Sequence, residues 1–181
     1  MLLKNSYNNI KNIIFKNACL VPGAKILDVG CGRRGNVYGI DPKAYTGIDS
    51  HFGGINRHKG DFTGRYYPMD AQKLSFDALF FDCVISVSLL HHLSAVELKN
   101  MMMEIKRVLK EDGKIIIADG VYPERKANIL GWLIRFLDRG RYVRTKYELK
   151  SLLSRYFCIE KEYYFVDKIF AYSIFVMGCK N

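Results

Sequence analysis

Short apolar runs alternate with amphipathic segments along most of the chain. Ile10, Ile13, Ile14 and Ala18 recur at helical spacing, which predicts a first helix over residues 6–20. Near-continuous apolar runs then predict a series of short buried strands, over residues 25–29, 44–48, 65–69, 81–87 and 114–118. Two further β-rich runs, 159–166 and 169–177, lie close enough in sequence to form a hairpin.

Two capping boxes mark where helices begin between these runs. Ser94 with Glu97 predicts a helix to about residue 109, closed by a turn over residues 110–113, and Thr145 with Glu148 predicts one to about residue 156. Strands that alternate with helices favour a doubly wound α/β fold. We therefore expect a mostly parallel seven-stranded sheet with a C-terminal antiparallel hairpin and helices on both faces, in a single domain over residues 1–181.

Composition narrows the class of protein. The chain has 181 residues, 49% of them apolar and 25% charged, which is typical of a globular domain. Its five cysteines are scattered and form no C-x-x-C pair, so we expect buried, reduced thiols. No transmembrane segment or secretory signal is evident, and a cytoplasmic location is expected. The net charge of +10 serves solubility or favours anionic partners such as RNA or acidic lipid.

Polar side chains follow four of the predicted strands: Asp49, Asp70, Ser86 and Asp119. In parallel sheets, ligands bind beyond the carboxyl ends of the strands. These residues are therefore candidates for one site at that edge of the sheet.

A glycine-rich turn runs from Gly30 to Gly35 and matches G-x-G-x-x-G. This pattern occurs in dinucleotide sites, which keeps a nicotinamide oxidoreductase open as a remote alternative. However, Asp28 lies two residues before the first glycine, where its carboxylate would repel a pyrophosphate. A carboxylate there suits a ligand that offers an ammonium and a sulfonium group.

Five segments in order resemble the class I S-adenosylmethionine-dependent methyltransferases, in particular a small-molecule methyltransferase-like domain. Residues 26–32 resemble motif I, and residues 45–49 resemble the second strand with its ribose-binding acid. Residues 69–74 resemble the adenine loop, residues 81–93 the fourth-strand motif, and residues 107–114 the crossing into strand five. The resemblance extends from about Lys25 to Ala118 and implies S-adenosyl-L-methionine as the cofactor.

The resemblance also implies roles for individual residues. Asp28, Gly30 and Gly32 would hold the methionine part, Asp49 the ribose, and Asp70 with Ala71 the adenine. Ser86 would line the site at the end of the fourth strand. The neighbouring Cys31, Ser50 and Met69 are included in the same cofactor site. Two connections beside it, residues 35–45 and 50–64, are shorter or more glycine-rich than in the family, which leaves open how far the site is enclosed.

His91 and His92 follow the fourth predicted strand, where a methyl acceptor would lie. A histidine can remove a proton from an acceptor hydroxyl or amine, so both are candidate catalytic bases. A structural role for the pair is the alternative. Neither has a partner at metal-ligand spacing, and no metal site is expected.

Residues 123–146 form the most distinctive segment. Its apolar residues cover a broad arc of a helix, and the segment contains seven basic and two acidic residues. We expect a lid over the acceptor pocket that recognises an anionic or lipid-like molecule or rests on a membrane surface. The alternative is a helix packed on the sheet with a solvated basic rim.

The sequence thus predicts a methyltransferase acting on a small or lipid-like acceptor. It lacks the N-P-P-Y-type sequence of base or glutamine amino-group methylation and the Pro-Cys pair of cytosine C5 methylation. The net charge leaves an RNA methyltransferase as one alternative. The short connections beside the site leave a catalytically silent cofactor-binding module as another.

Overall fold

The computed structural model describes residues 4–18, 21–32, 40–41, 43–51, 65–124, 128–137, 141–167 and 169–180. Gly35 lies outside the described residues, as do most of the two short connections that the sequence predicts beside the glycine turn.

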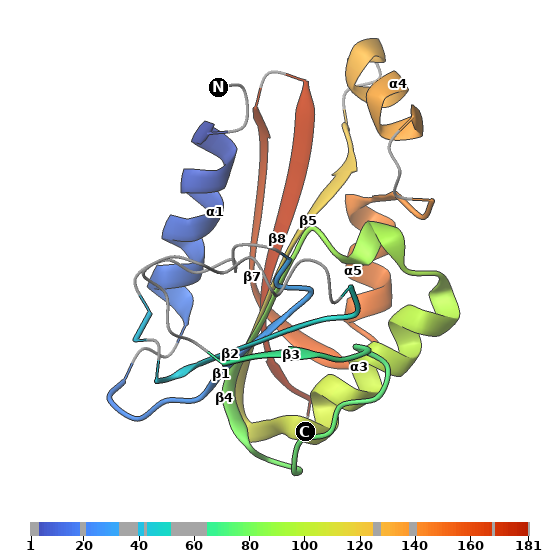
Figure 1. The fold of residues 1–181 in the computed structure, drawn as a ribbon. Coiled ribbons are helices and arrows are strands. Elements are labelled where there is room, and N and C mark those ends of the chain that lie inside the picture. The colour runs from blue at the N-terminus through green and yellow to red at the C-terminus, as the bar shows by residue number, and fades with distance from the viewer. Residues whose placement is uncertain are drawn as a thin grey trace.

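One mixed sheet forms the centre of the molecule (Figure 1). Its strands follow the order β3-β2-β1-β4-β5-β8-β7, and the first five pair in parallel. Strand β8 pairs antiparallel with both β5 and β7. The strands of this path are β1 (Ile26–Val29), β2 (Tyr45–Asp49), β3 (Arg65–Pro68), β4 (Phe81–Val87), β5 (Leu109–Tyr122), β7 (Phe157–Asp167) and β8 (Phe170–Cys179). The predicted fold class is confirmed, with β6 (Arg144–Thr145) added as an eighth strand that pairs with the end of β5.

Helices cover both faces of the sheet because the strands are apolar on both sides (Figure 1). Helix α1 (Lys4–Asn17) packs Ile10 and Ile14 against one face. Helices α3 (Ala95–Val108) and α5 (Lys146–Leu153) pack Met101, Ile105 and Leu153 against the other. Helix α4 (Ile129–Leu137) stands at the end of the molecule, beside the tip of the β7–β8 hairpin.

Both predicted capping boxes are present and fix the first turns of α3 and α5. Ser94 N donates to Glu97 Oε2 at 2.8 Å, and Glu97 N donates to Ser94 Oγ at 3.3 Å. The reciprocal bonds between Thr145 and Glu148 measure 2.7 and 3.2 Å. Each box satisfies donors that the first turn of a helix leaves without partners.

The boundaries of β5 differ from the prediction at both ends. Leu109 is fully buried and pairs with Phe81, so the chain passes from α3 into β5 without the expected turn at residues 110–113. At its other end β5 continues past Ala118, because β8 pairs with it as far as Val121. The pairing partner on β8 therefore sets the length of this strand.

The cysteines differ in burial. Cys31 and Cys83 are buried as predicted, whereas Cys158 is exposed on the outermost strand, β7. No helix in the described part of the chain is long and apolar enough to span a bilayer.

Candidate active site

The glycine turn follows β1 and closes against the end of β2. Gly30 and Gly32 have φ angles of +73° and +60°, a backbone conformation that glycine adopts readily. Gly30 N and Cys31 N both donate to Ile48 O, at 2.9 and 3.0 Å. The two strand ends are therefore held together by the backbone of the turn.

The two glycines differ in their surroundings. A β-carbon at Gly30 would lie 2.9 Å from the side chain of Leu89, in the segment after β4. Among the described residues, a β-carbon at Gly32 would meet nothing within 4 Å. Gly30 thus permits close packing as well as the turn, while Gly32 has no such close neighbour in the part of the chain that the structure describes.

Asp49 connects the parts of the predicted cofactor site. Its Oδ2 accepts from Gly32 N at 3.0 Å, its Oδ1 accepts from His51 N at 2.9 Å, and its backbone oxygen accepts from Met69 N at 3.0 Å. The side chain keeps 19% of its surface exposed, so a ligand can reach the carboxylate. Ser50, the next residue, is exposed. The structure thus brings the glycine turn, the end of β2 and the segment from Met69 together.

Asp70 lies in an exposed turn just after β3. Its Oδ1 accepts from Gln72 N at 2.9 Å, and its backbone oxygen accepts from Lys73 N at 3.1 Å. Met69 and Ala71 are partly buried on either side of it. Asp70 therefore stabilises its own turn and also presents a carboxylate at the same edge as Asp49.

Asp28 on β1 and Ser86 on β4 lie next to the start of the glycine turn. Both are fully buried. Tyr45 Oη donates to Asp28 Oδ2 at 2.5 Å, and Ser86 Oγ donates to Val29 O at 3.0 Å. Tyr45 was not among the residues selected from the sequence, because its strand gave no sign that its hydroxyl would pair with a carboxylate.

The carboxylates give the glycine turn a negative potential. Burial raises the pKa of the Cys31 thiol, and the charges of Asp28 and Asp49 raise it further. Burial and Asp28 likewise raise the pKa of Tyr45. Burial disfavours any charged group, whereas the negative charges of Asp28 and Asp49 disfavour a phosphate and favour a cation.

A second cluster forms beyond the ends of β4 and β5. His91 lies in the 3₁₀ turn η1 (Leu90–His92) and is 8% exposed. Its Nδ1 lies 2.5 Å from Asp119 Oδ1, and its backbone N donates to Asp119 Oδ2 at 3.1 Å. Asp119 is 1% exposed and also accepts from Gly120 N at 2.7 Å. The carboxylate therefore fixes both the ring and the backbone of His91.

His92 differs from His91 although the two rings lie 4.1 Å apart. His92 is exposed, whereas His91 is buried against Asp119. The sequence marked Asp119 only as a strand-ending carboxylate, since the residue lies 28 positions from its partner. The pairing depends on β4 and β5 being neighbours in the sheet.

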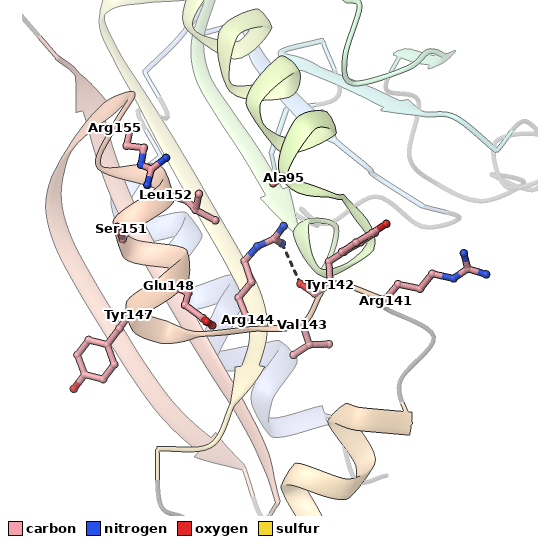
Figure 2. Close-up of a pocket in the computed structure, with 10 residues that line it drawn as sticks. All are labelled: Ala95, Arg141, Tyr142, Val143, Arg144, Tyr147, Glu148, Ser151, Leu152 and Arg155. Carbon is pink, nitrogen blue, oxygen red and sulfur yellow. Dashed lines mark hydrogen bonds between the residues drawn. The ribbon is translucent and has the colours of Figure 1, made fainter.

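A groove of about 810 Å³ adjoins this cluster, between α5, the start of α3 and residues 141–144 (Figure 2). Tyr142 N donates to His91 O at 3.0 Å, and Arg144 donates to Leu90 O and Leu93 O, both at 2.8 Å. Arg144 is partly buried, and burial lowers the pKa of its guanidinium. Arg141 and Arg155 add two exposed cations to the lining, which is therefore predominantly basic.

The described residues contain no group of three or more His, Cys, Asp or Glu side chains that could hold a metal ion. The chemistry visible here is that of carboxylates, one oriented imidazole and backbone amides.

Known proteins share both the sequence pattern and the fold. Residues 27–117 match the family model of the methyltransferase domain. A protein of Encephalitozoon cuniculi named as a candidate methyltransferase is 32% identical over 93 residues. That match covers 51% of this chain and 43% of the relative, so it spans less than half of the relative's length.

Two solved structures show the same fold. A protein of Pyrococcus horikoshii superposes with a TM-score of 0.75 at 22% identity, over 97% of this chain and 91% of the other. A SAM-dependent methyltransferase of Methanosarcina mazei superposes with a TM-score of 0.72 at 21% identity, over 93% and 98%. The family model extends from β1 into β5 and includes the glycine turn, Asp49 and both histidines. The chain therefore belongs to the methyltransferase-domain family, and its fold is that of the class I S-adenosylmethionine-dependent methyltransferases.

Proposed function

We propose that this protein transfers a methyl group from S-adenosyl-L-methionine to a small or lipid-like acceptor. The observation that carries this proposal is the junction at Asp49. Its partly exposed carboxylate accepts a hydrogen bond from the glycine turn, and its backbone oxygen accepts one from Met69. The negative potential of that junction suits a ligand with ammonium and sulfonium charges.

Each part of the junction contacts a different part of the cofactor in this proposal. Asp49, with Ser50 beside it, accepts hydrogen bonds from the ribose hydroxyls. Met69, Asp70 and Ala71 border the adenine. Gly30, Cys31 and Gly32 approach the methionine part closely, because the two glycines carry no side chain. The buried Asp28 and Ser86 support the turn from within, through Tyr45 and Val29.

When bound, the cofactor supplies an electrophilic methyl group on a sulfonium. The residues of this chain then have to align the acceptor and exclude water, because in-line transfer needs an approach of about 3 to 3.5 Å. Where the acceptor must lose a proton, His91 is the base that the geometry favours. Because the Asp119 carboxylate only accepts, Nδ1 of the neutral ring carries the hydrogen and donates it to Asp119, which makes Nε2 the basic nitrogen. His92, exposed beside it, is the second candidate.

The groove beside His91 supports the choice of acceptor. Its volume of about 810 Å³ lies in the range typical of small-molecule sites. Guanidinium groups at Arg141 and Arg155 suit an anionic head group, while Leu152 and Val143 offer apolar surface. In this proposal, residues 141–144 of the predicted lid form one wall of the acceptor site, and the reaction takes place in the cytoplasm.

Transfer of radiolabelled methyl groups tests the proposal. Purified protein is incubated with methyl-labelled S-adenosylmethionine and, in separate reactions, with a total lipid extract, a small-metabolite extract and total RNA. We expect label in the lipid or metabolite fraction and none in RNA. Label in RNA alone would contradict the acceptor class. Calorimetric binding of NAD, with no binding of S-adenosylmethionine or S-adenosylhomocysteine, would contradict the proposed chemistry itself.

A further inference from the structure

Helix α4 exposes a continuous apolar face. Ile129 is 74% exposed, Leu130 54%, Leu133 50% and Trp132 38%. At about 100° per residue, these four side chains span an arc of about 160° on the helix. Gly131 lies on the opposite side and is buried. The helix therefore turns its glycine side to the protein and these four apolar side chains toward solvent.

Specific contacts hold α4 in this orientation. Asn128 Oδ1 accepts from Gly131 N at 3.0 Å, while Asn128 Nδ2 donates to Ile169 O at 3.2 Å, between β7 and β8. A β-carbon at Gly131 would collide with the same Ile169 carbonyl oxygen, so the helix and the hairpin tip touch through backbone. The exposed face is thus presented at one end of the molecule, where Figure 1 shows α4 beside the β7–β8 hairpin.

Trp132 is fixed at one border of this face. Its indole stacks on Tyr122 with ring centroids 4.4 Å apart and planes 18° from parallel. Its Nε1 donates to Pro123 O at 3.1 Å. A tryptophan with a satisfied N–H beside exposed aliphatic side chains is typical of residues at a boundary between apolar and aqueous phases.

A second copy of this chain or a lipid bilayer could cover this face, and the charge of the protein distinguishes the two. The chain carries a net charge of +10, and residues 124–146 contain seven basic and two acidic residues. A second copy would carry the same net charge of +10 and be repelled. An anionic bilayer offers both an apolar interior and the complementary charge.

We infer that α4 docks this protein on anionic lipid membranes, with Ile129, Leu130, Trp132 and Leu133 entering the boundary between head groups and acyl chains. This inference goes beyond the proposed function and does not depend on it. It adds a surface from which a lipid-like acceptor could be taken.

The sequence contains a single tryptophan and twelve tyrosines, so emission excited selectively at tryptophan reports on α4 alone. The protein is titrated with vesicles of equal parts phosphatidylserine and phosphatidylcholine, and with vesicles of phosphatidylcholine alone. We expect a blue shift of Trp132 emission and co-sedimentation with the anionic vesicles only, both weakened by added salt.

Two separate variants, Leu133→Asp and Ile129→Asp, place a charge on the exposed face. Each should lower the vesicle partition coefficient at least about tenfold, because each removes one buried aliphatic side chain from the bilayer. Val96→Asp is the matched control, since Val96 is 68% exposed on α3. Circular dichroism verifies that all variants fold.

Three results would overturn the inference. One is a Trp132 emission spectrum that anionic vesicles leave unchanged. Another is vesicle binding that both charged variants retain, since attraction would then come from charge without insertion of α4. The third is an equal loss of binding in Val96→Asp, which would place the contact elsewhere.

Discussion

The candidate site has two parts along the carboxyl ends of the parallel strands, here called the β1–β2 edge and the β4–β5 edge, which differ in construction and in charge. At the β1–β2 edge, backbone amides of a glycine turn meet the carboxylate of Asp49, and burial with nearby acids raises the pKa of Cys31. At the β4–β5 edge, the buried pair of His91 and Asp119 lies beside a groove with three arginines. One edge thus favours a cationic ligand and the other an anionic one.

The two parts differ in how freely substitutions can alter them. The β1–β2 edge depends on backbone geometry within a few consecutive residues, which leaves little freedom for change. The β4–β5 edge is assembled from side chains far apart in sequence, so single substitutions can alter the groove while the sheet persists. Two variants, one at each edge, separate these contributions.

The largest effect on stability is expected from Asp119→Ala. It leaves His91, Gly120 N and the backbone of η1 without their buried acceptor. We expect the free energy of unfolding to fall by about 3 kcal/mol, as measured by urea denaturation. Asp119→Asn is the matched control and should cost less, because the amide oxygen still accepts. Equal stability of Asp119→Ala and the wild type would show that the pair contributes nothing to the fold.

A smaller effect is expected from Gly30→Ala, at the other edge. The substitution combines a positive φ with a contact to Leu89, so we expect a loss of about 2 kcal/mol. Gly32→Ala shares the positive φ but has open space around it, and should cost about 1 kcal/mol. Thermal unfolding of the two variants compares them directly. A greater loss at Gly32 would contradict the packing described for Leu89.

The sequence indicated the local backbone geometry of the β1–β2 edge better than the side-chain contacts of the β4–β5 edge, for a physical reason. A turn such as Gly30 to Gly32 needs glycine at fixed positions, so its geometry is visible in neighbouring residues. The hydrogen bonds to η1 come instead from residues that are distant in sequence and reach it only in the folded protein: Asp119, Tyr142 and Arg144. His91 was identified from its position after a strand, whereas nothing local to Asp119 indicated its partner.

The same distinction applies to the secondary structure. Both capping boxes were predicted, because Ser94 with Glu97 and Thr145 with Glu148 satisfy each other locally. The true extent of β5 was missed, because its pairing with β8 decides where it ends. Amphipathic α4 was indicated by its composition, but only the contact of Gly131 with the hairpin tip determines which face stays exposed.

The most direct test of the account measures cofactor affinity after a change at each edge. S-adenosylhomocysteine is titrated calorimetrically into the wild type, Asp49→Ala and His91→Gln, each verified as folded. Loss of the Asp49 carboxylate should weaken binding at least about tenfold, since it removes charged hydrogen bonds to the ribose. His91→Gln should bind within about twofold of the wild type, because His91 is assigned to the acceptor edge. Unchanged affinity in Asp49→Ala would show that the glycine turn and Asp49 do not form the cofactor site.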